Sequence, residues 1–244
     1  MKGFGAYVIF LGSLFVRRES FKTYYRLVLE ESVLIGVKSI GLVALVAFFI
    51  GAVTTVQTAY NLVSPIIPKY TIANVVREMT ILELAPTIMA IIYAGKVGSS
   101  MAGGLGTMRI TEQIDALEVM GINAASYLVL PKIIASLLMY PMLVILAGSC
   151  SLLGGYVVGA AAHLITPTDY SYGLRFAFDS YAITFALIKS FVFAFLISSI
   201  SSFKGYFTHG GALEVGIATT AAVTASIIAV LLSDYLLAQL LYVR

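Results

Sequence analysis

Two long stretches of this chain, residues 40–68 and 133–168, contain no Asp, Glu, Lys or Arg. Each is longer than the roughly 20 helical residues that cross a hydrocarbon core, and water does not tolerate apolar runs of this length on a protein surface. Composition agrees, because 60% of the residues are apolar and 11% are charged, whereas a soluble domain is about half apolar and a quarter charged. The sequence therefore predicts an all-α integral membrane protein.

The apolar runs divide into five predicted transmembrane helices. The second of them contains Arg77, Glu78 and Glu83, with Pro86 inside. Charges within a span are costly, so we expect this helix to face protein or a wet cavity rather than lipid tails. The five predicted spans are residues 40–60, 75–97, 133–168, 181–203 and 217–242.

The N-terminal region is predicted to lie in the membrane interface. Its apolar stretch Gly3–Val16 is too short to cross a core that requires roughly 20 helical residues. The next segment, Phe21–Val33, combines apolar residues at helical spacing with four charged side chains on or beside it. We therefore divide the chain into an interfacial elbow over residues 1–34 and a single transmembrane domain over residues 35–244.

The basic residues are unevenly distributed between the two ends of the predicted spans. Under the positive-inside rule, this asymmetry places the N-terminus in the cytoplasm and the C-terminus outside. The formal charge of +3 is small and its carriers are dispersed, so no basic face suits nucleic acid. The residues assigned to the cytoplasmic side are Lys2, Arg17, Arg18, Lys22, Arg26, Lys38, Lys96, Arg109, Lys132 and Lys204, and those on the opposite side are Lys69, Arg77, Arg175 and Arg244.

A short acidic helix is predicted on the water side, between the second and third spans. Thr111 is its expected N-cap, Glu112 and Asp115 lie in the expected first turn, where the helix dipole favours acids, and Gly121 suits the C-terminal end. Glu112, Asp115 and Glu118 share one face. The helix either docks on a partner protein or rests on lipid headgroups, and acids are poorly suited to an anionic leaflet. The apolar face consists of Ile110, Ile114, Leu117 and Gly121.

Three charged residues have similar predicted depths in the membrane. Glu83, Lys189 and Asp234 each lie about eight residues from the outer end of their span, which is roughly 12 Å at 1.5 Å per residue. We hypothesise that Lys189 pairs with Asp234, with Glu83 nearby, because an unpaired charge at this depth costs at least a few kcal/mol. The alternative is a purely structural pair that fixes helix packing.

Small residues at four-residue spacing predict close helix packing rather than substrate sites. Gln57 and Tyr60, near the outer end of the first span, suit either a cavity lining or an interfacial anchor. The predicted ridges are Gly51, Thr55 and Ala59; Gly95, Ser99 and Gly103; and Gly155 with Gly159.

The polar residues do not form a catalytic or metal-binding pattern. Cys150 is the only cysteine, and His163 and His209 lie far apart with no carboxylate at ligand spacing. No Ser, His and acid set falls in one membrane layer. We therefore expect no catalytic residue or metal site, and because no Gly-x-x-x-x-Gly-Lys-Ser/Thr loop occurs, we expect no nucleotide bound by this chain.

Ordered motifs along the chain resemble the MlaE (YrbE-type) family of ABC-transporter permeases. The central block comprises residues 83–86 (ELAP), 94–98 (AGKVG), 105–117 (LGTMRITEQIDAL) and 120–122 (MGI). The likeness continues over later segments and covers nearly the whole chain after the elbow. One position departs from the pattern, because relatives often carry Arg before the glutamate and this chain has Leu82.

The resemblance implies a homodimer with an elbow helix and five spans, which moves phospholipids or related lipids between membranes. It implies three further partners: a cytoplasmic ABC ATPase that binds ATP and Mg, a periplasmic lipid-binding protein with an MCE domain, and a small cytoplasmic regulator. A bacterial inner membrane is the expected location, in preference to an organellar envelope.

The resemblance also implies roles for individual residues. Residues 109–122 become the coupling helix that enters a groove in the ATPase, and Tyr60 matches a cavity tyrosine of the family. The expected ATPase contacts are Glu112, Asp115, Leu117, Glu118, Met120 and Gly121, and the expected lipid pathway or polar layer is Gln57, Tyr60, Glu83, Lys189 and Asp234.

The leading expectation is therefore a permease subunit energised by a separate ATPase. Two alternatives remain open. A proton-coupled secondary transporter would use Glu83 or Asp234 as its titrating group, and a membrane scaffold without transport would use the charged layer only for packing.

Overall fold

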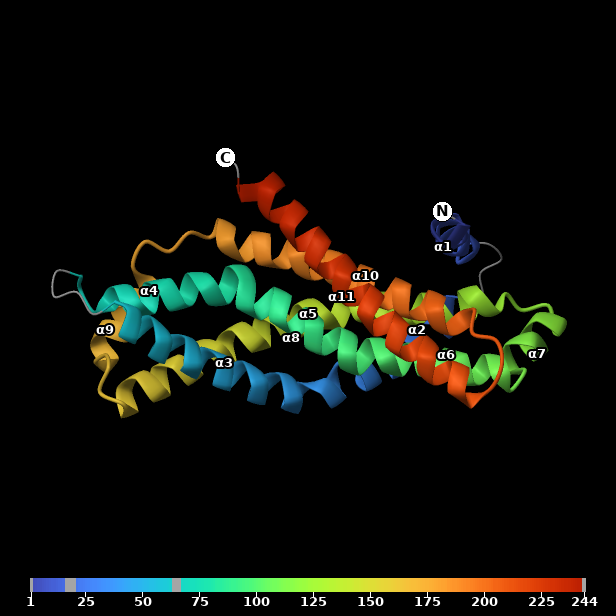
Figure 1. The fold of residues 1–244 in the computed structure, drawn as a ribbon, viewed down its shortest axis with the longest axis horizontal. Coiled ribbons are helices and arrows are strands. Elements are labelled where there is room, and N and C mark those ends of the chain that lie inside the picture. Colours follow the sequence, from blue (N-terminus) through green and yellow to red (C-terminus); the bar gives the residue numbers. More distant parts are fainter. Residues whose placement is uncertain (1, 16–20, 63–66, 243–244) are drawn as a thin grey trace. The chain divides into compact units, whose positions relative to one another are not determined.

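The computed structural model describes residues 2–15, 21–62 and 67–242, and the elements in these ranges are helices (Figure 1). Arg17, Arg18 and Arg244, which contribute to the predicted charge asymmetry, lie outside the described residues. The elements are α1 (Lys2–Ser13), α2 (Phe21–Ile35), η1 (Val37–Ser39), α3 (Ile40–Asn61), α4 (Tyr70–Met79), η2 (Thr80–Ile88), α5 (Met89–Tyr93), η3 (Ala94–Gly98), α6 (Ser99–Ile110), α7 (Gln113–Val119), α8 (Ala124–Ala161), α9 (Pro167–Arg175), α10 (Tyr181–Tyr206) and α11 (Ala212–Tyr242).

Four helical segments of the described chain are long and apolar enough to cross a membrane. They overlap the predicted first, third, fourth and fifth spans, which confirms these apolar runs as long helices; the first segment also includes the predicted interfacial residues 21–33. The four segments are Phe21–Asn61, Ala124–Ala161, Tyr181–Tyr206 and Ala212–Leu240.

Three predicted boundaries differ from the ends of the helices, and a side-chain cap accounts for each of the two earlier starts. Helix α8 begins at Ala124 rather than Ile133, since the Asn123 side chain accepts a hydrogen bond from the Ser126 N–H at 3.2 Å and caps the first turn. It ends at Ala161, and Thr168 belongs to α9. Helix α11 begins at Ala212 rather than Ile217.

The early start of α11 has a similar cause. The Glu214 carboxylate accepts the backbone N–H of Gly211 at 2.9 Å, as the third-position acid of a capping box does.

The predicted second span lies within an uninterrupted helical run from Tyr70 to Ile110 that changes type along its length. Thr80–Ile88 and Ala94–Gly98 are π-helical, and α-helix surrounds them. Pro86 explains the first change, because proline has no N–H to donate to the carbonyl four residues earlier. Such π segments occur often at functional sites.

The chain forms two compact units. The first unit contains Met1–Lys38, Ala90–Tyr140 and Phe191–Arg244, and the second contains Ser39–Met89 and Pro141–Ser190. Helices α8 and α10 each contribute residues to both units.

In the second unit, α3 packs closely on α8 through glycines. A Cβ on Gly51 would overlap the Ser151 backbone, and a Cβ on Gly154 would overlap the Phe48 backbone. A Cβ on Gly155 would overlap the side-chain hydroxyls of Thr55 and Tyr170. The predicted packing role of the Gly51 and Gly155 ridges is therefore confirmed.

Tyr170, on α9, completes this contact. Its buried hydroxyl donates to the Leu152 carbonyl at 3.1 Å. Burial raises the pKa of Tyr170 to about 12, partly offset by the Thr55 side chain, so the hydroxyl keeps its proton at neutral pH.

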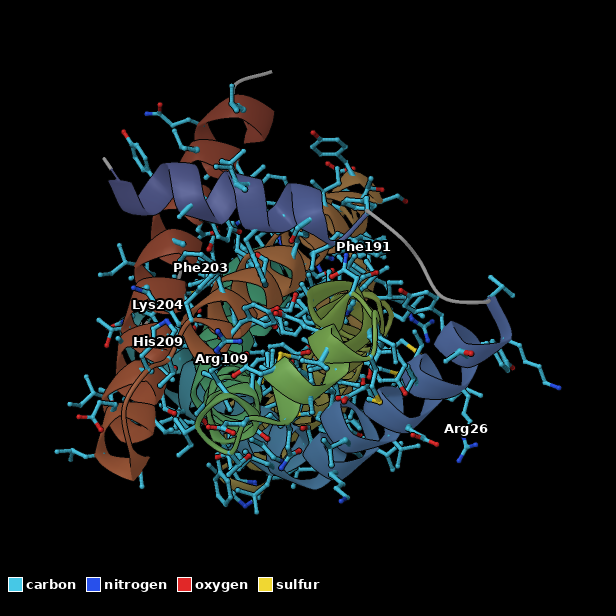
Figure 2. All side chains as sticks on the ribbon, turned by 90° about the vertical axis from the view of Figure 1, so that its right-hand side faces the viewer. Arg26, Arg109, Phe191, Phe203, Lys204 and His209 are labelled. Atoms are coloured by element: carbon cyan, nitrogen blue, oxygen red, sulfur yellow. The ribbon has the colours of Figure 1, made fainter. Side chains whose placement is uncertain are left out.

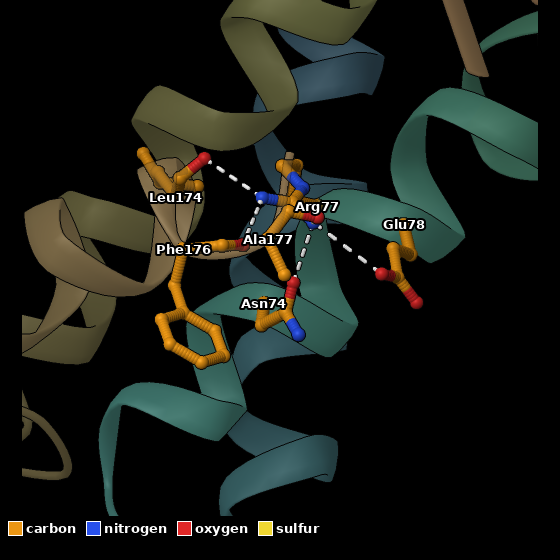
Figure 3. Close-up of polar contacts among 6 residues, drawn as sticks. All are labelled: Asn74, Arg77, Glu78, Leu174, Phe176 and Ala177. Carbon is orange, nitrogen blue, oxygen red and sulfur yellow. Dashed lines mark hydrogen bonds and ion pairs between the residues drawn. The ribbon is translucent and has the colours of Figure 1, made fainter. Parts of the chain in front are cut away.

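Helix α9 lies against α4, and Arg77 fixes the end of α9 to it (Figure 3). The guanidinium is only 3% exposed and donates to the carbonyls of Leu174 and Phe176 at 2.9 Å each, and to Asn74 Oδ1 at 2.5 Å. The Phe178 ring lies 5.3 Å from its Cζ. Arg77 therefore satisfies the carbonyls that the C-terminal turn of α9 leaves open.

In the first unit, α1 lies across the C-terminal part of α10, beside Phe203 (Figure 2). The Phe10 ring packs against Phe203, Tyr206 and Phe207 at centroid distances of 5.4 to 5.6 Å, and the Tyr7 hydroxyl bonds the Ser199 hydroxyl at 2.7 Å. On another side of the unit, α11 runs along α6 (Figure 1).

The α3–α8 contact yields a prediction about stability. Gly51→Ala should lower the free energy of unfolding by about 1–3 kcal/mol, because a methyl group would push two backbones apart. Gly41→Ala is a matched control on the same helix, where a Cβ meets nothing within 4 Å. It should be neutral or stabilise by up to about 1 kcal/mol. Thermal unfolding in detergent, followed by circular dichroism, compares them, and equal melting temperatures would contradict the contact.

Candidate functional site

The short helix α7 begins with a sharp reversal after α6. Thr111 is not its N-cap as predicted, because Thr111 ends α6 and its hydroxyl donates to the Thr107 carbonyl at 2.8 Å. Glu112 is the N-cap and has a left-handed backbone, with φ 59°, so it does not belong to the first turn. Only two residues separate the helices, and one must adopt the left-handed conformation, which costs energy in a non-glycine residue.

The C-terminal end of α7 is a Schellman motif, as the predicted role of Gly121 requires. Gly121 has φ 81°, its N–H donates to the Glu118 carbonyl at 3.0 Å, and the Ile122 N–H donates to the Leu117 carbonyl at 3.1 Å. Both ends of α7 therefore have a defined backbone geometry.

Two of the acidic side chains of α7 bind groups of the same chain. Asp115 accepts from Arg109 Nη1 at 2.7 Å, and Glu118 accepts from the Tyr206 hydroxyl at 2.8 Å. The Arg109 guanidinium also lies 5.9 Å from the centre of the Tyr206 ring. These contacts connect α7 to the C-terminal ends of α6 and α10, in the region where Figure 2 labels Arg109 and Phe203.

The apolar side of α7 packs largely into the first unit. Ile114 is fully buried in a cluster with Phe10, Leu105 and Val129, and Leu117 is partly buried against the same cluster. The large apolar side chains that remain outside are Val119, 88% exposed, and Met120, 66% exposed. Val119 was not among the predicted contacts, because it lies on the face from which only the acids were selected, four residues after Asp115.

A second group of predicted residues meets in the second unit. The fully buried Lys189 ammonium lies 2.6 Å from Oε1 of Glu83, a side chain that is 50% exposed. It also donates to the Leu82 carbonyl at 3.1 Å and lies 4.7 Å from the centre of the Phe185 ring. The predicted proximity of Glu83 and Lys189 is confirmed.

Pro86 lies in the same π-helical segment as Leu82 and Glu83. In an α-helix the residue-86 N–H would donate to the Leu82 carbonyl, and Pro86 has none. Lys189 supplies a donor to that carbonyl instead. The Thr87 hydroxyl donates to the other Glu83 oxygen at 3.2 Å.

The remaining predicted residues occupy separate positions. Asp234 is partly buried on α11 in the first unit, and its pairing with Lys189 stays a prediction. Gln57 and Tyr60 are exposed on one side of α3, near its C-terminal end.

The ion pair yields a stability prediction. Glu83→Gln should lower the free energy of unfolding by about 1–3 kcal/mol, because it leaves the Lys189 ammonium buried without its carboxylate. Glu78→Gln removes an acid of similar exposure, 3.3 Å from Arg77, and should cost less than about 1 kcal/mol. Lys189→Met in the Glu83→Gln background should restore stability. Thermal unfolding measures each variant. A larger loss from Asp234→Asn than from Glu83→Gln would instead make Asp234 the main partner.

Comparison with known proteins places this chain in one family, whose match covers most of its length. The family description "Permease MlaE" matches residues 28–240. A probable ABC transporter permease protein of Rickettsia bellii is 37% identical over 219 residues, which cover 90% of this chain and 84% of the relative. A second such protein, from Synechocystis, is 35% identical over 214 residues, or 88% and 81% of the two chains.

A plant relative extends the comparison. The chloroplastic protein Trigalactosyldiacylglycerol 1 of Arabidopsis thaliana is 33% identical over 239 residues, which cover 96% of this chain and 67% of the plant protein. Since the family match covers most of the chain, the protein belongs to the MlaE family of ABC-transporter permeases, which are transporter subunits rather than enzymes.

Proposed function

We propose that this chain is the membrane subunit of an ABC transporter that moves phospholipids or related lipids between the inner and outer membranes of a bacterium. It crosses the inner membrane five times, with the N-terminus in the cytoplasm and α1 and α2 in the interface. The run Tyr70–Ile110 supplies the second span. The chloroplastic relative supports a lipid substrate, because it is named after a galactolipid.

Helix α7 carries the proposal, because it has the properties of a coupling helix. It presents Val119 and Met120 to solvent, and it is connected to two long helical segments through Asp115 and Glu118. In the proposed function these two apolar side chains enter a groove on a separate cytoplasmic ATPase, which binds ATP and Mg. Motion of the ATPase then reaches α6 and α10.

The polar pair of the second unit belongs to the proposed lipid pathway. Glu83 is half-exposed within a segment proposed to cross the bilayer, and a carboxylate there is stable only beside protein or in a wet cavity. With Gln57, Tyr60 and Asp234 it forms the polar lining. Beyond the membrane, a periplasmic MCE-domain protein receives or supplies the lipid, and a small cytoplasmic protein regulates the ATPase.

We assign the homodimer contact to α11. A groove of about 820 Å³ runs along this helix, and small residues at four-residue spacing form its centre. In lipid, such residues let two backbones approach closely, and a second copy supplies the same face. The groove is lined by Leu213, Gly216, Ile217, Thr220, Ala221, Thr224, Ala225 and Ile228.

Reconstitution tests the transport function. Vesicles that contain the chain and its ATPase should move labelled phospholipid to an acceptor protein only with ATP and Mg. Met120→Asp should lower this transport on the order of tenfold, because a charge would enter the apolar contact. Met120→Leu keeps an apolar side chain of similar volume and should act like the wild type.

The rival functions predict other outcomes. Transport by the chain alone under a pH gradient would identify a proton-coupled transporter. No transport under any condition would favour a membrane scaffold without a transport role. Equal transport by Met120→Asp and Met120→Leu would show that the Met120 side chain of α7 does not contact the ATPase.

Cysteine cross-linking tests the dimer. In a Cys150→Ser background, Thr224→Cys should form a disulfide-linked dimer in membranes after mild oxidation, because the two copies of α11 meet at this position. Leu153→Cys, at an exposed position on α8, is the control and should remain monomeric. Efficient cross-linking at Leu153 with none at Thr224 would assign the interface elsewhere.

A further inference from the structure

A cavity lined by charged residues lies in the first unit and takes no part in the proposed pathway. Its volume is about 380 Å³, within the range of small-molecule sites. Residues from α2, η1, η3, α6 and α8 form it. The residues that matter for its chemistry are Glu31, Lys38, Lys96, Ser100, Lys132 and Met101.

The cavity is strongly basic. Three lysines and one glutamate line it, which gives a net charge of +2 (three minus one). Each ammonium carries three donors. Lys96 donates to the Lys38 carbonyl at 2.5 Å, and Lys132 pairs with Glu31. Within the described ranges, these are the hydrogen bonds and ion pairs of the three ammonium groups, so most of their donors remain for a ligand.

One acceptor in this cavity also lacks a partner. Oε2 of Glu31 is buried and has no hydrogen bond within the described part of the chain. A buried carboxylate oxygen is costly to leave without a donor. A ligand that fits the cavity therefore carries an anion for the lysines and a hydroxyl or amine donor for Glu31.

The rest of the wall is apolar. Ile35, Val97 and Met101 are buried side chains, and the exposed Leu34 continues this surface outward. These residues offer van der Waals contacts to a lipid acyl chain, whereas a free anion has no apolar part to make them.

We propose that this cavity binds an anionic glycerophospholipid at the basic face of the membrane. Its phosphate lies among Lys38, Lys96 and Lys132, its headgroup hydroxyls donate to Glu31, and an acyl chain follows Leu34 and Met101. Basic pockets between membrane helices bind such headgroups. The site requires a membrane-embedded chain but neither an ATPase nor transport.

This site differs from a set of ordinary surface lysines because part of it is buried. Surface lysines extend individually into the membrane interface. Lys132 and Glu31 are mostly buried, with 17% and 20% of their side chains exposed. Lys22, by contrast, is an exposed lysine of α2 outside the cavity lining.

Native mass spectrometry of the purified full chain in an uncharged detergent tests the proposal. Phosphatidylglycerol, which has one negative charge and two headgroup hydroxyls, should bind on the order of tenfold more tightly than phosphatidylcholine. Inorganic phosphate at the same concentration should not displace it. Equal binding of the two lipids, or full displacement by phosphate, would overturn the proposal.

Matched variants locate the binding. Ser100→Glu places a negative charge in the cavity at an exposed position and should abolish the preference for phosphatidylglycerol, whereas Ser100→Gln should retain it. Lys96→Gln should weaken binding about fivefold, and Lys22→Gln should leave it unchanged. Melting temperatures confirm that each variant is folded. The proposed site would be refuted if the two Ser100 variants bound phosphatidylglycerol equally, or if Lys96→Gln and Lys22→Gln did. This conclusion does not depend on the transport assay.

Discussion

The close approach of α3 and α8 is the contact on which the second unit depends. Apolar side chains gain little by leaving lipid for protein, so membrane helices associate through tight packing and hydrogen bonds. Gly51 and Gly154 supply the packing reciprocally, because each lies against the backbone of the other helix. Tyr170 then bonds the Leu152 carbonyl, and Arg77 fixes the end of α9. The outer elements of this unit are thus held by hydrogen bonds to backbone carbonyls.

Backbone hydrogen bonding explains why Lys189 and Glu83 occur within largely apolar helices. Pro86 has no N–H to donate along its π-helical segment, and the buried Lys189 ammonium donates to the Leu82 carbonyl of that segment. Its buried charge in turn requires Glu83. The structural and functional interpretations of this pair are therefore compatible. One side of Glu83 stabilises the lysine, and its exposed half remains available to a lipid pathway.

The sequence predicted what depends on composition and failed where distant residues decide. Long apolar runs identified four long helices, and helix rise alone placed Glu83 and Lys189 at a common depth, where the structure joins them. The predicted third span begins after Lys132, but Lys132 pairs with Glu31, 101 residues away, and lies inside α8, which starts earlier at the Asn123 cap. The predicted start of the short helix was wrong, because no local signal in the sequence shows that Glu112 adopts a left-handed backbone.

The geometry of α7 also explains why its acids and its apolar tip have different roles. Asp115 and Glu118 are already bound within the chain, so they set the position of α7 rather than its affinity for a partner. Val119 and Met120 come directly before the Schellman turn, whose backbone hydrogen bonds fix their direction. Ile114 anchors this tip in the core, and Asp115 and Glu118 connect it to Arg109 and Tyr206. In the proposed function, coupling therefore requires the internal contacts of α7 as much as the docking surface, and loss of the Tyr206 hydroxyl would weaken transmission while leaving the exposed tip unchanged.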